Sequence, residues 1–149
     1  MNSKMTAFED LEAKWRSNRP DWPGLMLCFY TGKVVPDFCA PMPRVPTPPV
    51  GTVFDETFVE HYRSAIDLNP AIHDGAVLIG REQIFDRYMI CGWSMRLYPP
   101  PGNSTPAPNR GSAFNSCLEM SDVGSVDRLY LLSAGQFIRF IAGAWITIE

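Results

Sequence analysis

Two segments of the chain have the periodicity of amphipathic helices. The first covers residues 6–17 and the second residues 52–69, each with its apolar side chains on one face. Each begins with a threonine followed three residues later by an acid, the spacing of a capping box. A shorter helix is predicted from Ala113 to about Met120, with Ser112 as its cap. The start and stop signals of the first two are Thr6 and Glu9, Asn18-Arg19-Pro20, Thr52 and Asp55, and Pro70.

Short apolar runs bounded by turn residues predict the strands. Leu25–Tyr30 follows Pro23-Gly24, and the turn Gly80–Gln83 separates two runs that we expect to form a hairpin. The remaining runs predict three more strands towards the carboxyl end. The hairpin runs are 73–79 and 84–93, and the later strands are 128–132, 136–142 and 145–148. Together these elements predict the α/β class, with a mixed sheet flanked by helices that include 6–17 and 52–69.

Two segments are too rich in proline for a helix or a central strand. Residues 36–49 contain six prolines, and residues 98–112 combine proline with serine and asparagine. We expect both to be loops within one domain. The first is either a plain connector held extended by its prolines or a loop that shapes a ligand site.

The composition narrows the class of protein. The 149 residues, 46% hydrophobic and 19% charged, suit a single globular domain covering 1–149. The net charge of −3 argues against a dedicated nucleic-acid binder. No apolar run is long enough to span a membrane, and acids occupy the place of a signal peptide's apolar core, so we expect a cytoplasmic protein.

The cysteines do not predict a metal site. Zinc ligands usually come in closely spaced pairs, and none of the four cysteines forms such a pair. Reduced thiols packed in or near a cytosolic core are the expected state. The residues are Cys28, Cys39, Cys91 and Cys117.

The first candidate site is His73-Asp74-Gly75-Ala76, at the head of a predicted strand. An aspartate in this position can hold a divalent cation or accept a proton from a hydroxyl. The glycine beside it lets a flat ligand approach the backbone. The alternative is that Asp-Gly is simply the turn that enters the strand.

The second candidate site is Asn109-Arg110-Gly111-Ser112-Ala113, which leads from a loop into a helix. Free backbone N–H groups, a hydroxyl and a guanidinium are the usual components of a phosphate site. Junctions of this composition are common, however, and most of them bind water alone.

The two candidate sites occur together in the order found in the diadenylate cyclase domain family, the nucleotidyltransferase domain of the DNA-integrity scanning protein. Asn69–Ile79 resembles that family's Asp-Gly-Ala motif with its flanks, and Gly92–Leu97 resembles its Gly-x-x-x-x-Leu. The resemblance continues through Arg110–Ser121 and Asp127–Ser133. It covers about residues 52–143, and Leu25–Tyr30 would be an earlier strand of the family fold.

The resemblance implies a site for ATP or another nucleotide. The family's enzymes join two ATP molecules into cyclic di-AMP, and each of two facing protomers holds one ATP. By position, Asp74 would meet Mg²⁺ or Mn²⁺ and the attacking 3′-hydroxyl, and would be the catalytic residue of an active enzyme. Gly75 and Ala76 would line the nucleoside pocket, and Arg110, Gly111, Ser112 and Ser133 would contact the rest of the nucleotide.

The sequence departs from the family where phosphate and metal are held. Arg110-Gly111-Ser112 stands in place of Arg-His-Arg, and Ala134 follows Ser133 where an acid is expected. Phosphoryl transfer depends on neutralising charge at the triphosphate, so these losses affect turnover more than binding.

Three hypotheses follow from this pattern. The first is a sensor-like domain that binds a nucleotide or cyclic dinucleotide with weak or no turnover, as proposed for relatives in bacterial signalling, and that acts through an effector protein. The second is an active diadenylate cyclase. The third is a structural or adaptor domain without a ligand.

Overall fold

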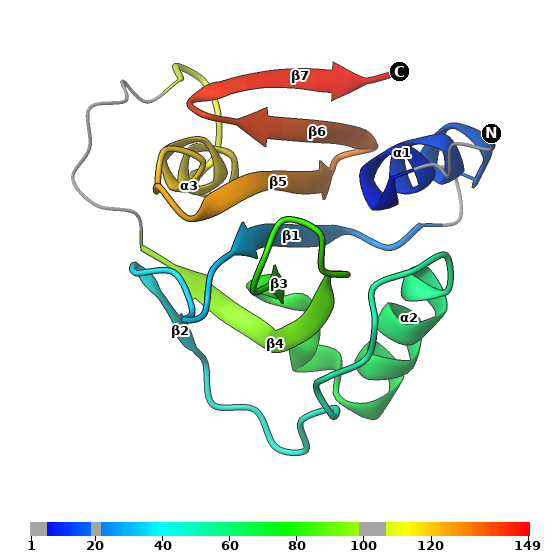
Figure 1. The fold of residues 1–149 in the computed structure, drawn as a ribbon. Coiled ribbons are helices and arrows are strands. Elements are labelled where there is room, and N and C mark those ends of the chain that lie inside the picture. The colour runs from blue at the N-terminus through cyan, green and yellow to red at the C-terminus, as the bar shows by residue number, and fades with distance from the viewer. Residues whose placement is uncertain (1–5, 19–21, 99–106) are drawn as a thin grey trace, which may run out of the picture.

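The computed structural model describes residues 6–18, 22–98 and 107–149. Seven strands form one mixed sheet in the order β2-β4-β3-β1-β5-β6-β7 (Figure 1). Strands β1 and β3 are parallel, and the other neighbouring pairs are antiparallel. The strands are β1 (Leu25–Thr31), β2 (Cys39–Pro41), β3 (Ala76–Arg81), β4 (Met89–Leu97), β5 (Val126–Ser133), β6 (Gln136–Ile141) and β7 (Ala144–Ile148). The predicted α/β class, a mixed sheet flanked by helices, is confirmed.

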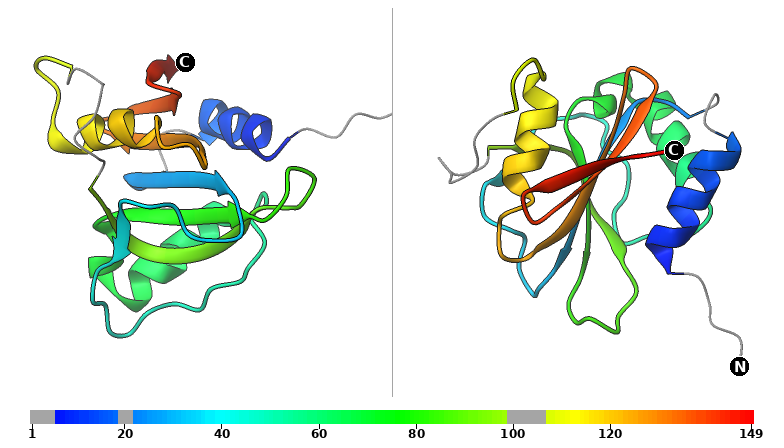
Figure 2. Two further views of the ribbon diagram at one scale, coloured as in Figure 1. Left: turned by 60° about the vertical axis from the view of Figure 1, so that its left-hand side comes forward. Right: turned by 90° about the horizontal axis from the view of Figure 1, so that it is seen from above.

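The helices cover the two faces of the sheet unequally (Figure 2). They are α1 (Ala7–Asn18), α2 (Phe58–Leu68), the 3₁₀ helix η2 (Pro70–His73) and α3 (Ser112–Met120). Helices α1 and α2 pack on one face with Leu27 and Phe29, and α3 packs on the other with Cys28 and Tyr30. Because side chains alternate along a strand, β1 contributes to an apolar core on each face.

Helix α1 is tied to the sheet by a buried carboxylate. Glu12, 7% exposed, accepts hydrogen bonds from the Tyr130 hydroxyl and from Arg139 Nη1. Both partners come from adjacent strands, β5 and β6. A buried charge is tolerated when it is paired and hydrogen-bonded in this way.

The second predicted helix starts later than its sequence pattern indicates. Residues 51–54 run extended along β4 instead, where Ile90 N donates to the Thr52 carbonyl and Val53 bridges Met89. The predicted Thr52/Asp55 capping box is therefore wrong: Asp55 accepts from the Thr57 backbone and hydroxyl, and α2 begins at Phe58. Pairing with a strand outcompetes the local capping signal.

Two other local predictions are also wrong in detail. The second hairpin strand begins at Met89 rather than Ile84, because Gln83 and Asp86 close a turn through two mutual hydrogen bonds. Ser112 is not the cap of α3; Gly111 holds that position and the helix start has no side-chain cap. The hairpin of β3 and β4 itself is confirmed.

Of the two proline-rich segments, 36–49 is a loop that contains the short edge strand β2. Proline is tolerated on an edge strand because its missing N–H faces no partner. The predicted helix stop at Arg19-Pro20 and most of the second loop, 99–106, lie outside the described residues.

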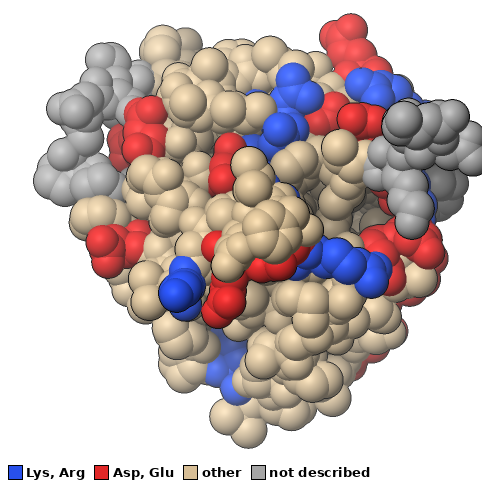
Figure 3. Space-filling model, in the orientation of Figure 1, with Lys and Arg blue, Asp and Glu red and all other residues tan. Residues whose placement is uncertain are grey.

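Acidic and basic side chains interleave on the face shown in Figure 3, without a field of one sign. In the described ranges, no helix combines the length and apolar character needed to cross a membrane.

Candidate functional site

Helix η2 places Asp74 just before the start of β3. Pro70 stops α2 and opens η2, and the Asn69 side chain caps the new turn by accepting from Ala71 N. Asp74 ends the turn, with its N–H bonded to the Ala71 carbonyl, and its side chain is 69% exposed. The carboxylate therefore stands at the rim of the sheet, available to a ligand from solvent.

A pocket of about 370 Å³ opens beside Asp74. It lies between the start of β3, the end of β4 and the first turns of α3, on the α3 face of the sheet. Its walls are mainly apolar, with hydroxyl groups, one guanidinium and one carboxylate at the edge. The lining residues are Met26, Met42, Asp74, Gly75, Met95, Arg96, Leu97, Ser112, Ala113 and Ser116. We call it the Asp74 pocket.

Gly75 allows the proline-rich loop 36–49 to pack directly against the backbone at the start of β3. Its φ of +89° is in the region that favours glycine. A Cβ at this position would lie 2.6 Å from Met42 Cε and 2.8 Å from the Met95 carbonyl oxygen. Only a glycine fits this backbone without displacing the loop.

The same loop places Arg44 against Asp74. Arg44 Nη2 lies 3.5 Å from Asp74 Oδ2, and Arg44 Nε donates to Ser94 Oγ at 2.9 Å. Ser94 in turn donates its hydroxyl hydrogen bond to the Asp74 carbonyl, and its own carbonyl accepts from Met42 N. Ser94 therefore fixes both partners of the ion pair.

The first turn of α3 forms the opposite wall. Gly111 precedes the helix, no acidic residue lies in the first turn, and Ser112 and Ser116 face the pocket. Unsatisfied N–H groups at a helix start favour an anion. Arg96, exposed at the end of β4, adds positive charge to the same pocket.

The structure brings three of the sequence-predicted residues together: Asp74, Gly75 and Ser112 all line the pocket. Ala76 lies just inside, fully buried in the core, and Gly111 is exposed at the helix start. Their contacts with a nucleotide stay predictions.

Arg110 does not line this pocket. Its guanidinium lies over the rings of Phe114 and Trp145, 4.5 and 4.8 Å from their centroids. These cation–π contacts direct it towards β7 rather than towards Asp74.

Ser133 lies at the same end of the sheet as Asp74, two strands away. In the sheet register Leu132 pairs with Leu25, and Leu27 pairs with Val77. The end of β5 and the starts of β1 and β3 therefore lie at the same end of the sheet. Ser133 is exposed there and does not line the pocket.

The residues of this site that sequence reasoning missed include Arg44, Arg96, Ser116 and Met42. Arg44 is the one basic residue of the segment 36–49, which was a signal in the sequence. Its contact with Asp74 spans 30 positions, and no local pattern predicts such a contact.

The lining residues are a poor set of ligands for Mg²⁺ or Mn²⁺. Such ions prefer several oxygen ligands, including carboxylates, and the lining of this pocket offers Asp74 alone. That carboxylate already faces a guanidinium. In the described part of the chain, no group of three or more His, Cys, Asp or Glu could hold a metal ion.

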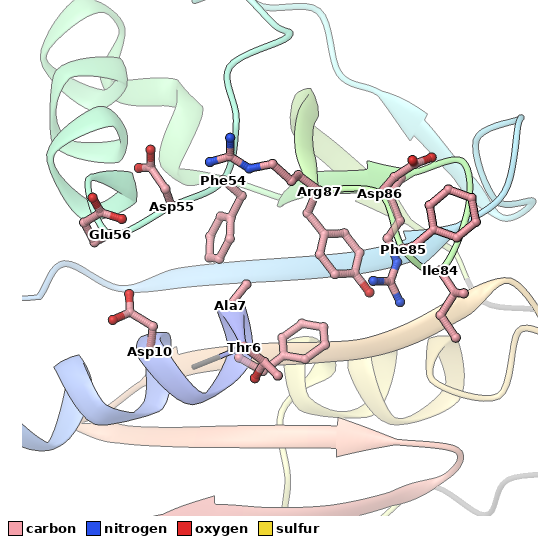
Figure 4. A pocket seen from close by; sticks show the side chains of 13 residues that line it. Thr6, Ala7, Asp10, Phe54, Asp55, Glu56, Ile84, Phe85, Asp86 and Arg87 are labelled. Atoms are coloured by element: carbon pink, nitrogen blue, oxygen red, sulfur yellow. The ribbon is translucent and has the colours of Figure 1, made fainter. Parts of the chain in front are cut away.

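A second cleft, of about 870 Å³, lies at the opposite end of β3 (Figure 4). Two of its lining side chains already have partners: Arg81 lies over the Tyr88 ring and donates to Thr31, and Tyr88 donates to Asp127. Burial, followed by the contact with Asp127, raises the pKa of Tyr88 well above its ordinary value. The lining mixes acidic and basic side chains and favours no single class of ligand, so the Asp74 pocket is the better candidate.

Comparison with known proteins supports the fold and does not assign a family. No protein-family model and no curated protein sequence matches this chain. The solved structures that are similar include two that match over 96% of its length: a hypothetical membrane spanning protein from Bacillus cereus (TM-score 0.59, 16% identity) and DacA from Staphylococcus aureus (TM-score 0.57, 12% identity). This chain spans 60% of the first and 86% of the second. At such low identity the similarity concerns the fold alone.

Proposed function

We propose, from the fold shared with DacA, that this protein binds a nucleotide or cyclic dinucleotide in the Asp74 pocket and acts as a sensor with weak or no cyclase turnover. The observation that carries the proposal is the meeting of Asp74-Gly75 with the start of α3 around one pocket. Its volume of about 370 Å³ is within the usual range for small-molecule sites.

The pocket chemistry suits the parts of a nucleotide. The methionines and Leu97 offer an apolar surface to a base, and the Asp74 carboxylate can accept a hydrogen bond from a ribose hydroxyl. The hydroxyls of Ser112 and Ser116, the free N–H groups of α3 and Arg96 can hold a phosphate. Arg110 and Ser133 remain proposed contacts from the family resemblance.

Weak turnover follows from the groups that the pocket lacks. A cyclase must neutralise the triphosphate and activate a 3′-hydroxyl, which ordinarily takes several cations and carboxylates. Here Asp74 is paired with Arg44, and Ala134 stands where the family has an acid. Binding needs fewer groups than catalysis, so a sensor fits this site better than an enzyme.

Isothermal titration calorimetry with ATP and with cyclic di-AMP tests the binding. We expect a measurable affinity for at least one of them. Asp74→Ala and Ser112→Ala should each weaken it about 3- to 10-fold, the loss of one hydrogen bond. Asp67→Ala, which removes an exposed carboxylate of α2, is the matched control and should leave affinity unchanged.

Turnover is measured by chromatography after incubation with ATP and Mg²⁺ or Mn²⁺. Formation of a cyclic dinucleotide that disappears in Asp74→Asn would replace the sensor proposal with an active cyclase. Absence of binding by either nucleotide would instead leave a structural or adaptor domain.

A sensor of this kind needs an output. The family resemblance suggests two proposals: a face-to-face homodimer across the ligand, or an effector protein that recognises the loaded form. Light scattering with and without cyclic di-AMP distinguishes them, because the first predicts a ligand-dependent doubling of mass.

A further inference from the structure

The Arg44 side of the Asp74–Arg44 ion pair is held in place by the fold. The Arg44 side chain is 17% exposed, and its guanidinium has three further neighbours: Ser94 Oγ, the Pro43 carbonyl and Met42 Sδ. The loop that carries it is fixed at both ends of this region, since Met42 N bonds the Ser94 carbonyl and Asn69 Nδ2 bonds the Pro46 carbonyl.

The guanidinium lies where a cation bound to Asp74 would have to compete with it. Arg44 Nη2 is 3.5 Å from Asp74 Oδ2, so a divalent ion on that oxygen would sit beside a fixed positive charge. The other lining groups near Asp74 are thioethers and hydroxyls, which are weak ligands for Mg²⁺ or Mn²⁺.

We infer that Arg44 takes the place of a divalent metal at Asp74, so that the pocket binds its nucleotide without a metal ion. The inference rests on the proposed function. A lone carboxylate beside phosphates would repel them, and the guanidinium cancels that charge from within the chain. Arg44 is thus a residue that sets the metal requirement of the site.

Titration of ATP into the wild-type protein, in EDTA and then in Mg²⁺, is the first test. We expect the affinity in EDTA to be within about 3-fold of that in Mg²⁺, or tighter. Binding that is lost in EDTA and restored by Mg²⁺ would overturn the inference. This measurement does not depend on any variant folding.

Variants of Arg44 and Asp74 test whether this pair sets the metal dependence of ATP binding. Arg44→Gln should weaken ATP binding in EDTA by about 10-fold or more, and Mg²⁺ should restore it, because the carboxylate is then unpaired. Arg44→Lys keeps the charge and should remain independent of metal. Adding Asp74→Asn to Arg44→Gln should abolish the metal dependence. Arg87→Gln, in the cleft at the other end of β3, is the matched control and should behave as wild type.

Electron paramagnetic resonance of Mn²⁺ tests the inference without a nucleotide. We expect the wild-type protein to leave Mn²⁺ free. Arg44→Gln should bind it weakly but measurably more tightly than wild type, because Asp74 is the one carboxylate among the described residues that line the pocket and is then unpaired. Mn²⁺ bound equally by wild type and Arg44→Gln, and lost in Asp74→Asn, would contradict the inference. If no nucleotide binds but the Mn²⁺ results hold, the proposed function fails while the role of Arg44 stands.

Discussion

At the scale of single residues, the site depends on two positions, Gly75 and Ser94, where the backbone has a positive φ and close neighbours. Gly75 has a positive φ and lies under Met42, and Ser94, also at positive φ (53°), joins the loop to Asp74. A non-glycine residue at positive φ is strained and persists where the surroundings over-determine it. Ser94 is such a residue, fully buried with its hydroxyl bonded on both sides.

Gly75→Ala should reduce the free energy of unfolding by at least about 2 kcal/mol, from the strained φ and the contacts of the new Cβ. Gly124→Ala is the control, because a Cβ there meets nothing within 4 Å and its φ is not positive. Urea unfolding followed by circular dichroism measures both. Equal stability of the two variants would show that the loop yields to the added methyl group.

At the scale of elements, the first turns of α1 and α3 differ in whether a side chain caps their N–H groups. Thr6 Oγ1 accepts a hydrogen bond from Glu9 N at 3.0 Å, as its capping-box spacing predicts. The start of α3 has no side-chain cap, although Ser112 is its first residue. Because Ser112 and Ala113 line the Asp74 pocket, a ligand there lies beside the first turn of α3, whose N–H groups no side chain caps.

Thr6→Ala should destabilise the protein by about 1 kcal/mol through the lost cap. Ser112→Ala should change stability by less than about 0.5 kcal/mol, because its hydroxyl caps nothing. Thermal unfolding without ligand compares the two. A large loss of stability in Ser112→Ala would mean that this serine supports the fold, and its effect on binding would then be indirect.

At the scale of the whole molecule, buried tyrosines are part of the apolar cores on both faces of the sheet. Burial is the largest cause that raises the pKa of Tyr30, Tyr62, Tyr88 and Tyr130, and that of Tyr62 rises to about 12. The unfolded chain ionises its tyrosines near pH 10, before the folded protein does. Above that pH the unfolded state binds fewer protons, so stability falls as pH rises.

Each such tyrosine should lower the free energy of unfolding by about 1.4 kcal/mol per pH unit above its unfolded pKa. For Tyr62 this loss extends from about pH 10 to about pH 12. Tyr62→Phe should therefore flatten the decline, at the cost of its hydrogen bond to the Gly24 carbonyl. Urea midpoints between pH 8 and pH 11, with tyrosinate absorbance, measure the slope. An unchanged slope in the variant would exclude Tyr62 as a contributor.

The pattern of residues along the chain was enough to predict the mixed α/β architecture, most strand positions and the residues before β3, because hydrophobic period, proline and glycine act over a few neighbouring residues. The family resemblance, rather than any local pattern, led us to expect Asp74 beside the loop that precedes α3, and Asp74 and Gly75 do line one pocket with Ser112. The later start of α2 was decided by pairing with β4, and the direction of Arg110 by aromatic rings from α3 and β7. The Arg44–Asp74 pair was likewise decided by tertiary structure. Each of these depends on residues distant in the chain, whose contacts exist only once the sheet has assembled.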